Sequence, residues 1–220
     1  MRRKRELFVG ITVLLIATLA FLFGWTNIFT VKAVSVAGSP NSQITKQVLQ
    51  IADIKVGQKL ARVDPRNVSS KLSLSGIDWI ENVKVSRNWF TREVTINLSA
   101  RIPVAAAGDR YVDTNGVIFT SPITLDKKLA TINAKSDSSR AAAITLYLAL
   151  PAELRNQVTA ITASSTDNFQ LILNEKLHLN WGSNSNTSVK IKIYKALIAL
   201  PENKKITQMD VSDPTKPTVK

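Results

Sequence analysis

One segment of the chain reads Trp79-Ile80-Glu81-Asn82-Val83-Lys84-Val85-Ser86-Arg87-Asn88-Trp89. Within it Val83 and Val85 alternate with polar residues, and the same alternation returns over residues 94–98. A repeat of two is typical of a strand that buries one face and exposes the other. The segment and the residues after it therefore predict two consecutive strands of a half-buried sheet.

The residues before this segment predict one more strand and two helices. Residues 29–36 read as a strand, and apolar residues at helical spacing over residues 44–51 indicate a helix. Asp64 and Pro65 provide the N-cap and first turn of a second helix, which should end near Gly76. The predicted order β-α-α-β-β gives a sheet covered by two helices, an α+β fold.

The N-terminus combines a basic start with a long uncharged run. Four cations at residues 2–5 precede residues 7–31, which contain no charged side chain. As a helix, a run of this length crosses a hydrocarbon core of about 30 Å, and the basic residues should stay in the cytoplasm. We therefore expect a cytoplasmic tail (1–6), a transmembrane helix (7–28) and an extracytoplasmic remainder.

A cleaved signal peptide is the alternative reading of the same run. Ser35-Val36-Ala37 has the small residues of a cleavage site. The apolar run is, however, longer than the roughly 7–15 residues of a typical signal-peptide core, and the candidate site lies too far downstream. This length favours an uncleaved anchor.

The composition removes several functional classes. The chain has no cysteine and one histidine, His178, which excludes disulfides, thiolate metal sites, thiol nucleophiles and most His-paired triads. The Ser-x-x-Lys motif of penicillin-binding transpeptidases is absent. A pair of glycosidase carboxylates can come from any two places in a sequence, so composition leaves that class open. We expect a binding protein with no catalytic residue, cofactor or metal.

The net charge of +13 is spread along the chain. No basic stripe interleaved with aromatic residues, as in single-strand nucleic-acid binding, is present. Outside the cytoplasm, the polyanions that such a chain meets are lipid headgroups and wall polymers. A basic surface that only confers solubility is the simpler reading.

Three patterns resemble the POTRA module of the FtsQ/DivIB bacterial cell-division proteins when they follow a single N-terminal span. They are Phe29-x-Val31-x-x-Val34-x-Val36-x-Gly38, Gly57-x-x-Leu60 and the Trp79–Trp89 segment. The chain departs from the family at Phe90, where a Pro is usual, and at Ala100, where a Glu usually precedes Arg101. The resemblance implies a POTRA domain over residues 29–101.

The rest of the chain resembles the C-terminal β domain of the same family. Asn115-Gly116 accepts the positive φ angles of a tight hairpin, and residues 138–150 favour a helix. Residues 169–173 and 177–181 read as two strands around a turn. The resemblance implies a second, mixed β domain over residues 102–213, with helices on one side, and a C-terminal tail over residues 214–220.

An open sheet invites strand addition at its edges. The last predicted strand, Ile206–Val211, is the candidate because Pro214 and Pro217 withhold N–H groups as the chain leaves the fold. In the helix that precedes this strand, Val189, Ile193 and Leu197 should face the sheet. The expected partner-binding residues are Thr207, Gln208, Met209, Asp210, Val211, Ser212 and Asp213 in the strand, and Lys190, Lys192 and Lys195 in a nearby charged rim.

The resemblance also implies partners and a role. The family's β domain holds FtsB (DivIC-type) and FtsL-type proteins by strand addition, with the septal transpeptidase and other divisome members as further partners. The expected protein is a non-enzymatic scaffold of septal wall synthesis in the cytoplasmic membrane at the division septum, with neither nucleic acid nor a small molecule as ligand. The alternative is a membrane-anchored POTRA-type protein that binds exported polypeptides in a secretion or assembly pathway.

Overall fold

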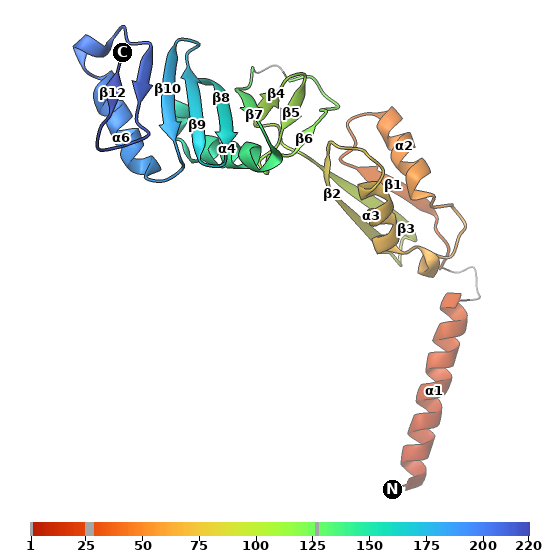
Figure 1. Cartoon of the computed structure of the whole chain (residues 1–220). Coiled ribbons are helices and arrows are strands. Elements are labelled where there is room, and N and C mark those ends of the chain that lie inside the picture. The colour runs from red at the N-terminus through yellow and green to blue at the C-terminus, as the bar shows by residue number, and fades with distance from the viewer. Residues whose placement is uncertain (1, 25–28, 126–127) are drawn as a thin grey trace. The chain divides into compact units, whose positions relative to one another are not determined.

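A computed structural model describes residues 2–24, 29–125 and 128–220 of the chain. Its first helix is α1 (Arg2–Gly24), in the region where a span over residues 7–28 was expected; residues 25–28 lie outside the described part. Among the described residues, no helix has both the length and the apolar character that a membrane crossing requires. The chain divides into two compact units, Met1–Ala100 and Arg101–Lys220 (Figure 1).

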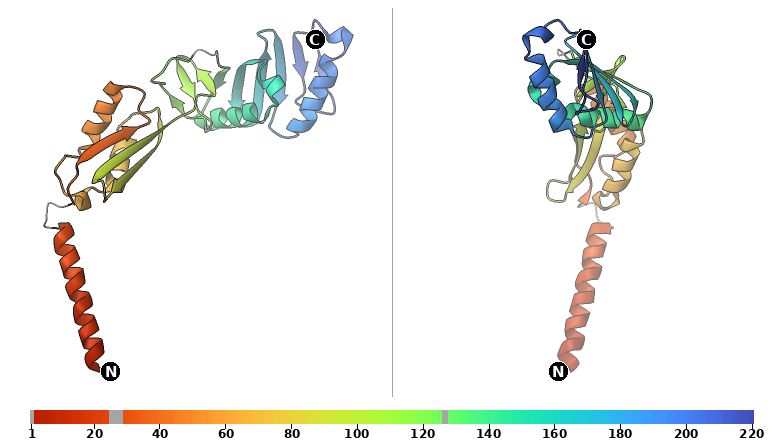
Figure 2. Two further views of the ribbon diagram at one scale, coloured as in Figure 1. Left: turned by 180° about the vertical axis from the view of Figure 1, so that it is seen from behind. Right: turned by 60° about the vertical axis from the view of Figure 1, so that its left-hand side comes forward.

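After α1 the first unit has the predicted β-α-α-β-β order. Its sheet has the strand order β1-β3-β2, with β1 parallel and β2 antiparallel to β3. Both main helices cover one face of this sheet, as the two opposite views show (Figures 1 and 2). The elements are β1 (Ala33–Ala37), α2 (Ser42–Ala52), the short 3-10 helix η2 (Leu60–Arg62), α3 (Pro65–Ser73), β2 (Ile80–Asn88) and β3 (Glu93–Ala100).

Side-chain caps fix where these helices begin. Asn41 Oδ1 accepts the N–H of Ile44 at 2.9 Å before α2, and Asp64 Oδ1 accepts the N–H of Arg66 at 2.9 Å before α3. Each bond satisfies one of the N–H groups that a first helical turn leaves free. The N-cap predicted at Asp64 is confirmed.

Gly38 ends β1 in a conformation that other residues avoid. Its φ is +80°, and a Cβ atom at this position would lie 2.1 Å from the backbone oxygen of Leu98. The first strand therefore closes against β3 only because residue 38 has no side chain.

The second unit is built on one mixed sheet of nine strands. Their order is β12-β11-β10-β9-β8-β7-β4-β5-β6. The strands are β4 (Ala105–Ala107), β5 (Arg110–Val112), β6 (Ile118–Phe119), β7 (Thr131–Ala134), β8 (Val158–Ser165), β9 (Asn168–Leu173), β10 (Leu177–Gly182), β11 (Gln208–Asp210) and β12 (Thr218–Val219). The helices are α4 (Asp137–Ala149), α5 (Ala152–Arg155), α6 (Thr187–Ile198) and the 3-10 helix η3 (Pro201–Asn203).

The predicted Asn-Gly hairpin joins β5 to β6. Asp113, which is buried, accepts the N–H groups of Asn115 and Val117 through Oδ1 at 2.8 Å each. Its Oδ2 forms an ion pair with Arg101. Arg101, which lacks the usual preceding Glu, thus pairs with a carboxylate of the second unit, and this pair ties the first residue of that unit to the hairpin.

The two faces of the larger sheet differ sharply. One row of aligned residues crosses six strands and is wholly apolar: Ile132, Ile161, Leu171, Leu179, Met209 and Val219. This row belongs to the core against which α4 and α6 pack on one face (Figure 2). The next row crosses the same strands and is wholly polar: Asn133, Thr162, Gln170, Asn180, Asp210 and Thr218. The sheet is therefore covered by helices on one side, as predicted.

Candidate functional site

The C-terminal edge of the larger sheet differs from the one predicted. Strand β11 does not lie at the edge, because β12 pairs with it in antiparallel register, Met209 opposite Val219 and Asp210 opposite Thr218. The ladder continues at Lys220, whose N–H and C=O both bond to Gln208, at 2.9 and 3.1 Å. The expectation that the chain leaves the fold at Pro214 is wrong: residues 214–220 turn back and cover β11.

Among the residues that the structure describes, β12 is therefore the outermost strand at this end of the sheet. Gln208 and Lys220 exchange both of their backbone bonds, so the residue between the two bonded positions of β12 points its own groups the other way. That residue is Val219, whose N–H and C=O face away from β11. Pro217, two positions earlier, has no N–H to offer. The edge thus presents one donor, at Val219, to an incoming strand.

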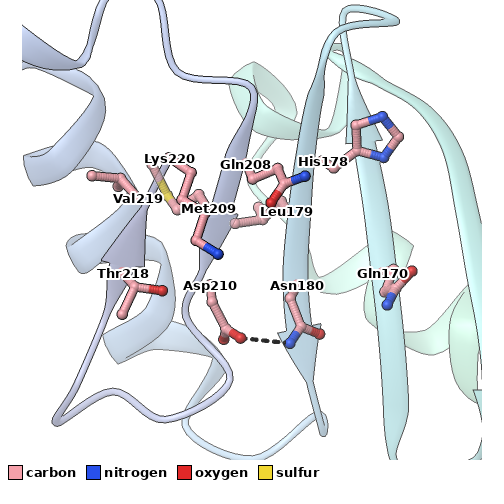
Figure 3. Close-up of a pocket in the computed structure, with 10 residues that line it drawn as sticks. All are labelled: Gln170, His178, Leu179, Asn180, Gln208, Met209, Asp210, Thr218, Val219 and Lys220. Atoms are coloured by element: carbon pink, nitrogen blue, oxygen red, sulfur yellow. Dashed lines mark hydrogen bonds between the residues drawn. The ribbon is translucent and has the colours of Figure 1, made fainter.

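A polar hollow lies beside this edge, on the face without helices. Figure 3 shows its side chains on strands β9 to β12 and at the chain end. Its volume is about 430 Å³, and its lining is formed by Gln170, His178, Leu179, Asn180, Gln208, Met209, Asp210, Thr218, Val219 and Lys220. Gln170, Asn180, Asp210 and Thr218 belong to the polar row. His178, Gln208 and Lys220 are aligned in a second row on the same strands. We call the polar members of this set the polar face; they are Gln170, His178, Asn180, Gln208, Asp210, Thr218 and Lys220.

Asp210 is the fixed point of the polar face. Its Oδ2 accepts Asn180 Nδ2 at 2.7 Å, the bond drawn in Figure 3. Its Oδ1 accepts the backbone N–H and the hydroxyl of Ser212 at 2.8 and 2.6 Å. Burial alone would raise the pKa of Asp210, but the hydrogen bonds from Ser212 and Asn180 and the charge of Lys190 together hold it below its ordinary value of 3.8.

This network predicts a pH dependence of stability. A carboxyl whose folded pKa is depressed stabilises the fold above its unfolded pKa, and that contribution disappears as the pH falls through the folded pKa. Asp210→Asn should therefore lower the free energy of unfolding by a constant amount above about pH 5, and the difference from the wild type should shrink below pH 3.8. Urea unfolding of both proteins across this range measures it; two parallel pH profiles would contradict the assignment.

Helix α6 covers the other side of the edge, and its buried stripe agrees with the predicted one only in part. Ile193 and Leu197 pack against the core, as predicted. Val189 is 44% exposed, whereas Lys190 is fully buried and Tyr194 nearly so. Lys190 Nζ donates to the carbonyl oxygens of Trp181 and Ser183, both at 2.8 Å, and lies 5.9 Å from the centre of the Trp181 ring. The placement of Lys190 in a charged rim is wrong, because its long side chain reaches the polar end of β10 through the core.

Burial lowers the pKa of Lys190, and the nearby Asp210 carboxylate partly offsets this effect. The cation is held by two backbone carbonyls, and the charge of Asp210, at the end of β11, also favours it. Lys190 thus ties α6 to the end of β10 and to the loop after it, and its side chain is buried.

The other predicted residues divide between surface and core. Lys192 and Lys195 are exposed, and Lys195 Nζ lies 3.0 Å from Glu153 Oε2. Thr207, Gln208 and Asp213 are exposed, and Asp210 and Ser212 are half-buried. Met209 and Val211 belong to the core. A substitution of either would damage the fold, so neither can report on partner binding by itself.

The prediction included Gln208 and Asp210 of the polar face but missed its other strand residues, Gln170, His178 and Asn180, and the residues that make the edge, Thr218 to Lys220. The alternation of Gln170, His178 and Asn180 with apolar neighbours was the available signal for the polar face. His178 is exposed, and it lies on a strand, as predicted for residues 177–181. Strand β12 contains only two β-branched residues, and a run that short does not predict a strand.

The polar groups of this site are suited to hydrogen bonding with a polypeptide. Among the residues that the structure describes, no group of three or more His, Cys, Asp and Glu could hold a metal ion. The polar face offers amides, a hydroxyl, one carboxylate and one imidazole next to an unpaired strand edge. Such a surface suits a polypeptide that adds a strand and places polar side chains over the hollow.

Two family models match the chain along nearly its whole length after α1. Residues 29–101 match the FtsQ-type POTRA domain, and residues 100–212 match the C-terminal region of cell division protein FtsQ/DivIB. The chain belongs to the FtsQ/DivIB family. The FtsQ/DivIB C-terminal match ends at residue 212, so β12 lies beyond the matched region.

Relatives named cell division protein FtsQ occur in several actinobacteria. The Mycolicibacterium smegmatis protein is 27% identical over 99% of this chain and 65% of its own length. The Mycobacterium leprae protein is 27% identical over 80% of the chain and 51% of its own length, and the Streptomyces venezuelae protein 26% over 95% and 80%. The chain thus spans about half to two-thirds of the mycobacterial FtsQ proteins it matches. Their shared name places this FtsQ/DivIB chain among the cell division proteins.

Proposed function

We propose that the chain is a non-enzymatic scaffold of the division machinery. It binds FtsB (DivIC-type) and FtsL-type partners and thereby links early division proteins to septal peptidoglycan synthesis, with the septal transpeptidase as a further partner. Family membership supports the division role. The open edge at Val219, beside a polar hollow of about 430 Å³, is the single observation that supports partner binding at this end.

The proposal includes membrane anchoring at the septum. The uncharged run over residues 7–31 and the cations at residues 2–5 support an N-terminus in the cytoplasm and an extracytoplasmic bulk. Under this arrangement both compact units meet partners outside the cytoplasm.

The partner strand joins at β12 in this proposal, one strand further out than the sequence indicated. An added strand takes its first hydrogen bonds from Val219, and its side chains lie over the polar face on one side. Thr207, Gln208 and Asp213 then contribute as neighbours of this edge, while Met209 and Val211 support it from within. Lys192 and Lys195 remain the exposed cations of α6 that can steer an acidic partner segment.

Val219→Pro tests this edge. Proline removes the outward N–H but leaves the bonds between Gln208 and Lys220, so the partner loses a hydrogen bond while the inner ladder stays intact. Loss of one bond with its acceptor left unpaired costs about 1–3 kcal/mol, so affinity for the joined ectodomains of the FtsB- and FtsL-type partners should fall about 5- to 150-fold. Isothermal titration with both proteins measures this affinity.

Val219→Thr is the matched control, because threonine keeps the N–H and the β-branched shape. It should bind like the wild type. Equal affinity of the proline and wild-type proteins would exclude the β12 edge as the attachment point and would leave the division role standing.

A further inference from the structure

The turn between β2 and β3 carries the most exposed aromatic side chain that the structure describes. Phe90 is 98% exposed. The turn that holds it is ordered, because Asn88 Oδ1 accepts the N–H groups of Phe90 and Thr91 at 2.9 and 3.1 Å. Folding does not bury this ring, so it is accessible to a ligand outside the unit.

An aromatic base supports this turn. The rings of Trp89 and Phe29 meet edge to face, with centroids 5.9 Å apart. Arg87 stacks on Trp89 at 5.4 Å and donates to the carbonyl oxygen of Val63 at 2.8 Å. Phe90 thus follows directly after a packed aromatic cluster, and the hydrogen bonds to Asn88 hold the turn in which its ring is exposed.

Cations surround the same end of the unit. Lys32 N–H bonds to the carbonyl of Arg92, and Thr30 bridges Lys59, so the start of β1, the hairpin and the loop before η2 lie together. The cations contributed by these segments are Lys32, Lys55, Lys59, Arg62, Arg87 and Arg92. Three carboxylates share this end: Asp53 lies 4.0 Å from Lys55, Asp64 caps α3, and Glu93 accepts Thr91. The surface around Phe90 is therefore basic.

The chain also enters the unit at this end. Strand β1 runs parallel to β3, with Ala33 opposite Glu93, so the start of β1 and the hairpin are neighbours. Phe29, in the aromatic base, follows the last residue of α1, Gly24, by five residues, and a chain of that length spans at most about 18 Å.

We propose that this end of the first unit rests on an anionic lipid bilayer, with Phe90 at the level of the headgroups and the surrounding cations against lipid phosphates. The inference rests on the proposed membrane anchoring, which brings the hairpin within reach of the bilayer. Aromatic rings favour the membrane interface, and each Lys or Arg near an anionic surface strengthens binding about fivefold. The docked hairpin fixes the orientation of the first unit above the membrane.

The test uses the full chain in lipid vesicles. Because the chain has no cysteine, Thr91→Cys and Leu74→Cys each carry one fluorescent label. Leu74 is 85% exposed and follows the C-terminal end of α3, whereas the N-terminal end of α3 follows Val63 at the hairpin end. In vesicles of phosphatidylcholine with phosphatidylglycerol, a quencher attached to the lipid should quench the label at residue 91 several-fold more than that at residue 74.

Two changes should remove this difference. Phe90→Ser, added to Thr91→Cys, takes away the inserted ring, and 1 M salt shortens the Debye length to about 3 Å and screens the cations. Vesicles of phosphatidylcholine alone should also reduce it.

Each other outcome overturns the inference in a distinguishable way. If the protein floats with the vesicles but an aqueous quencher reaches both labels equally, docking is refuted and the anchor stands. Protein that does not float with the vesicles would refute the anchor and docking together. Protection of residue 91 that develops only when partner ectodomains are added would assign the surface to a protein partner instead.

Discussion

Gly38→Ala is expected to destabilise the first unit by about 3 kcal/mol or more. An L-residue in the left-handed region costs roughly 1–2 kcal/mol, and here the new Cβ would also lie 2.1 Å from the Leu98 backbone oxygen. Relief requires β1 to move away from β3, which disturbs the pairing of Ala37 with Asn97. Hydrogen exchange at the β3 amides, measured by mass spectrometry on the full chain, reports this unit separately from the second one.

Gly76→Ala is the control for that experiment. Gly76 has nearly the same φ, +78°, but nothing lies within 4 Å of a Cβ built there. It should therefore show only the conformational cost of about 1–2 kcal/mol. Equal protection in the two variants would mean that the contact with Leu98 relaxes without cost and that the close approach of β1 to β3 is not essential.

Lys190→Ala should destabilise the second unit by about 2–4 kcal/mol. The substitution leaves the carbonyl oxygens of Trp181 and Ser183 without their donor, at about 1–3 kcal/mol for each buried group that remains unsatisfied. It also empties space against the Trp181 ring. Exchange at the β10 amides measures the loss.

Two further variants separate the causes. Lys190→Met fills the space without donating, so its loss should fall between those of the wild type and the alanine variant. Lys192→Ala, at an exposed position of the same helix, should stay within about 0.5 kcal/mol of the wild type. If Lys190→Ala is as stable as Lys192→Ala, the buried role of Lys190 is refuted, and Lys190 is a surface residue as the sequence suggested.

Local patterns in the sequence were sufficient to predict most elements. The cap at Asp64, the Asn-Gly hairpin and the alternating strands of both units depend on residues close together in the chain. Each pattern has one physical cause, and that cause acts within a few residues. The β-α-α-β-β order of the first unit followed from these patterns together.

The candidate site was harder to predict because it depends on contacts far apart in sequence. Strand β12 has two residues and exists through its bonds to β11 across a loop that contains two prolines. Read alone, Pro214 and Pro217 indicate an end of the fold. Lys190 misled for a related reason: helical periodicity assigns a lysine to solvent, whereas carbonyls of β10 and the loop after it draw its amine inward.

The two rows of side chains on the larger sheet also specify what an added strand must look like. Each row ends at β12, the apolar row at Val219 and the polar row at Thr218. A segment that continues the sheet beyond Val219 must therefore alternate, with apolar side chains extending the helix-covered core and polar ones extending the open face. A partner could thus be recognised in its own sequence by a short stretch of this period, and a uniformly polar or uniformly apolar stretch would leave one of the two rows mismatched.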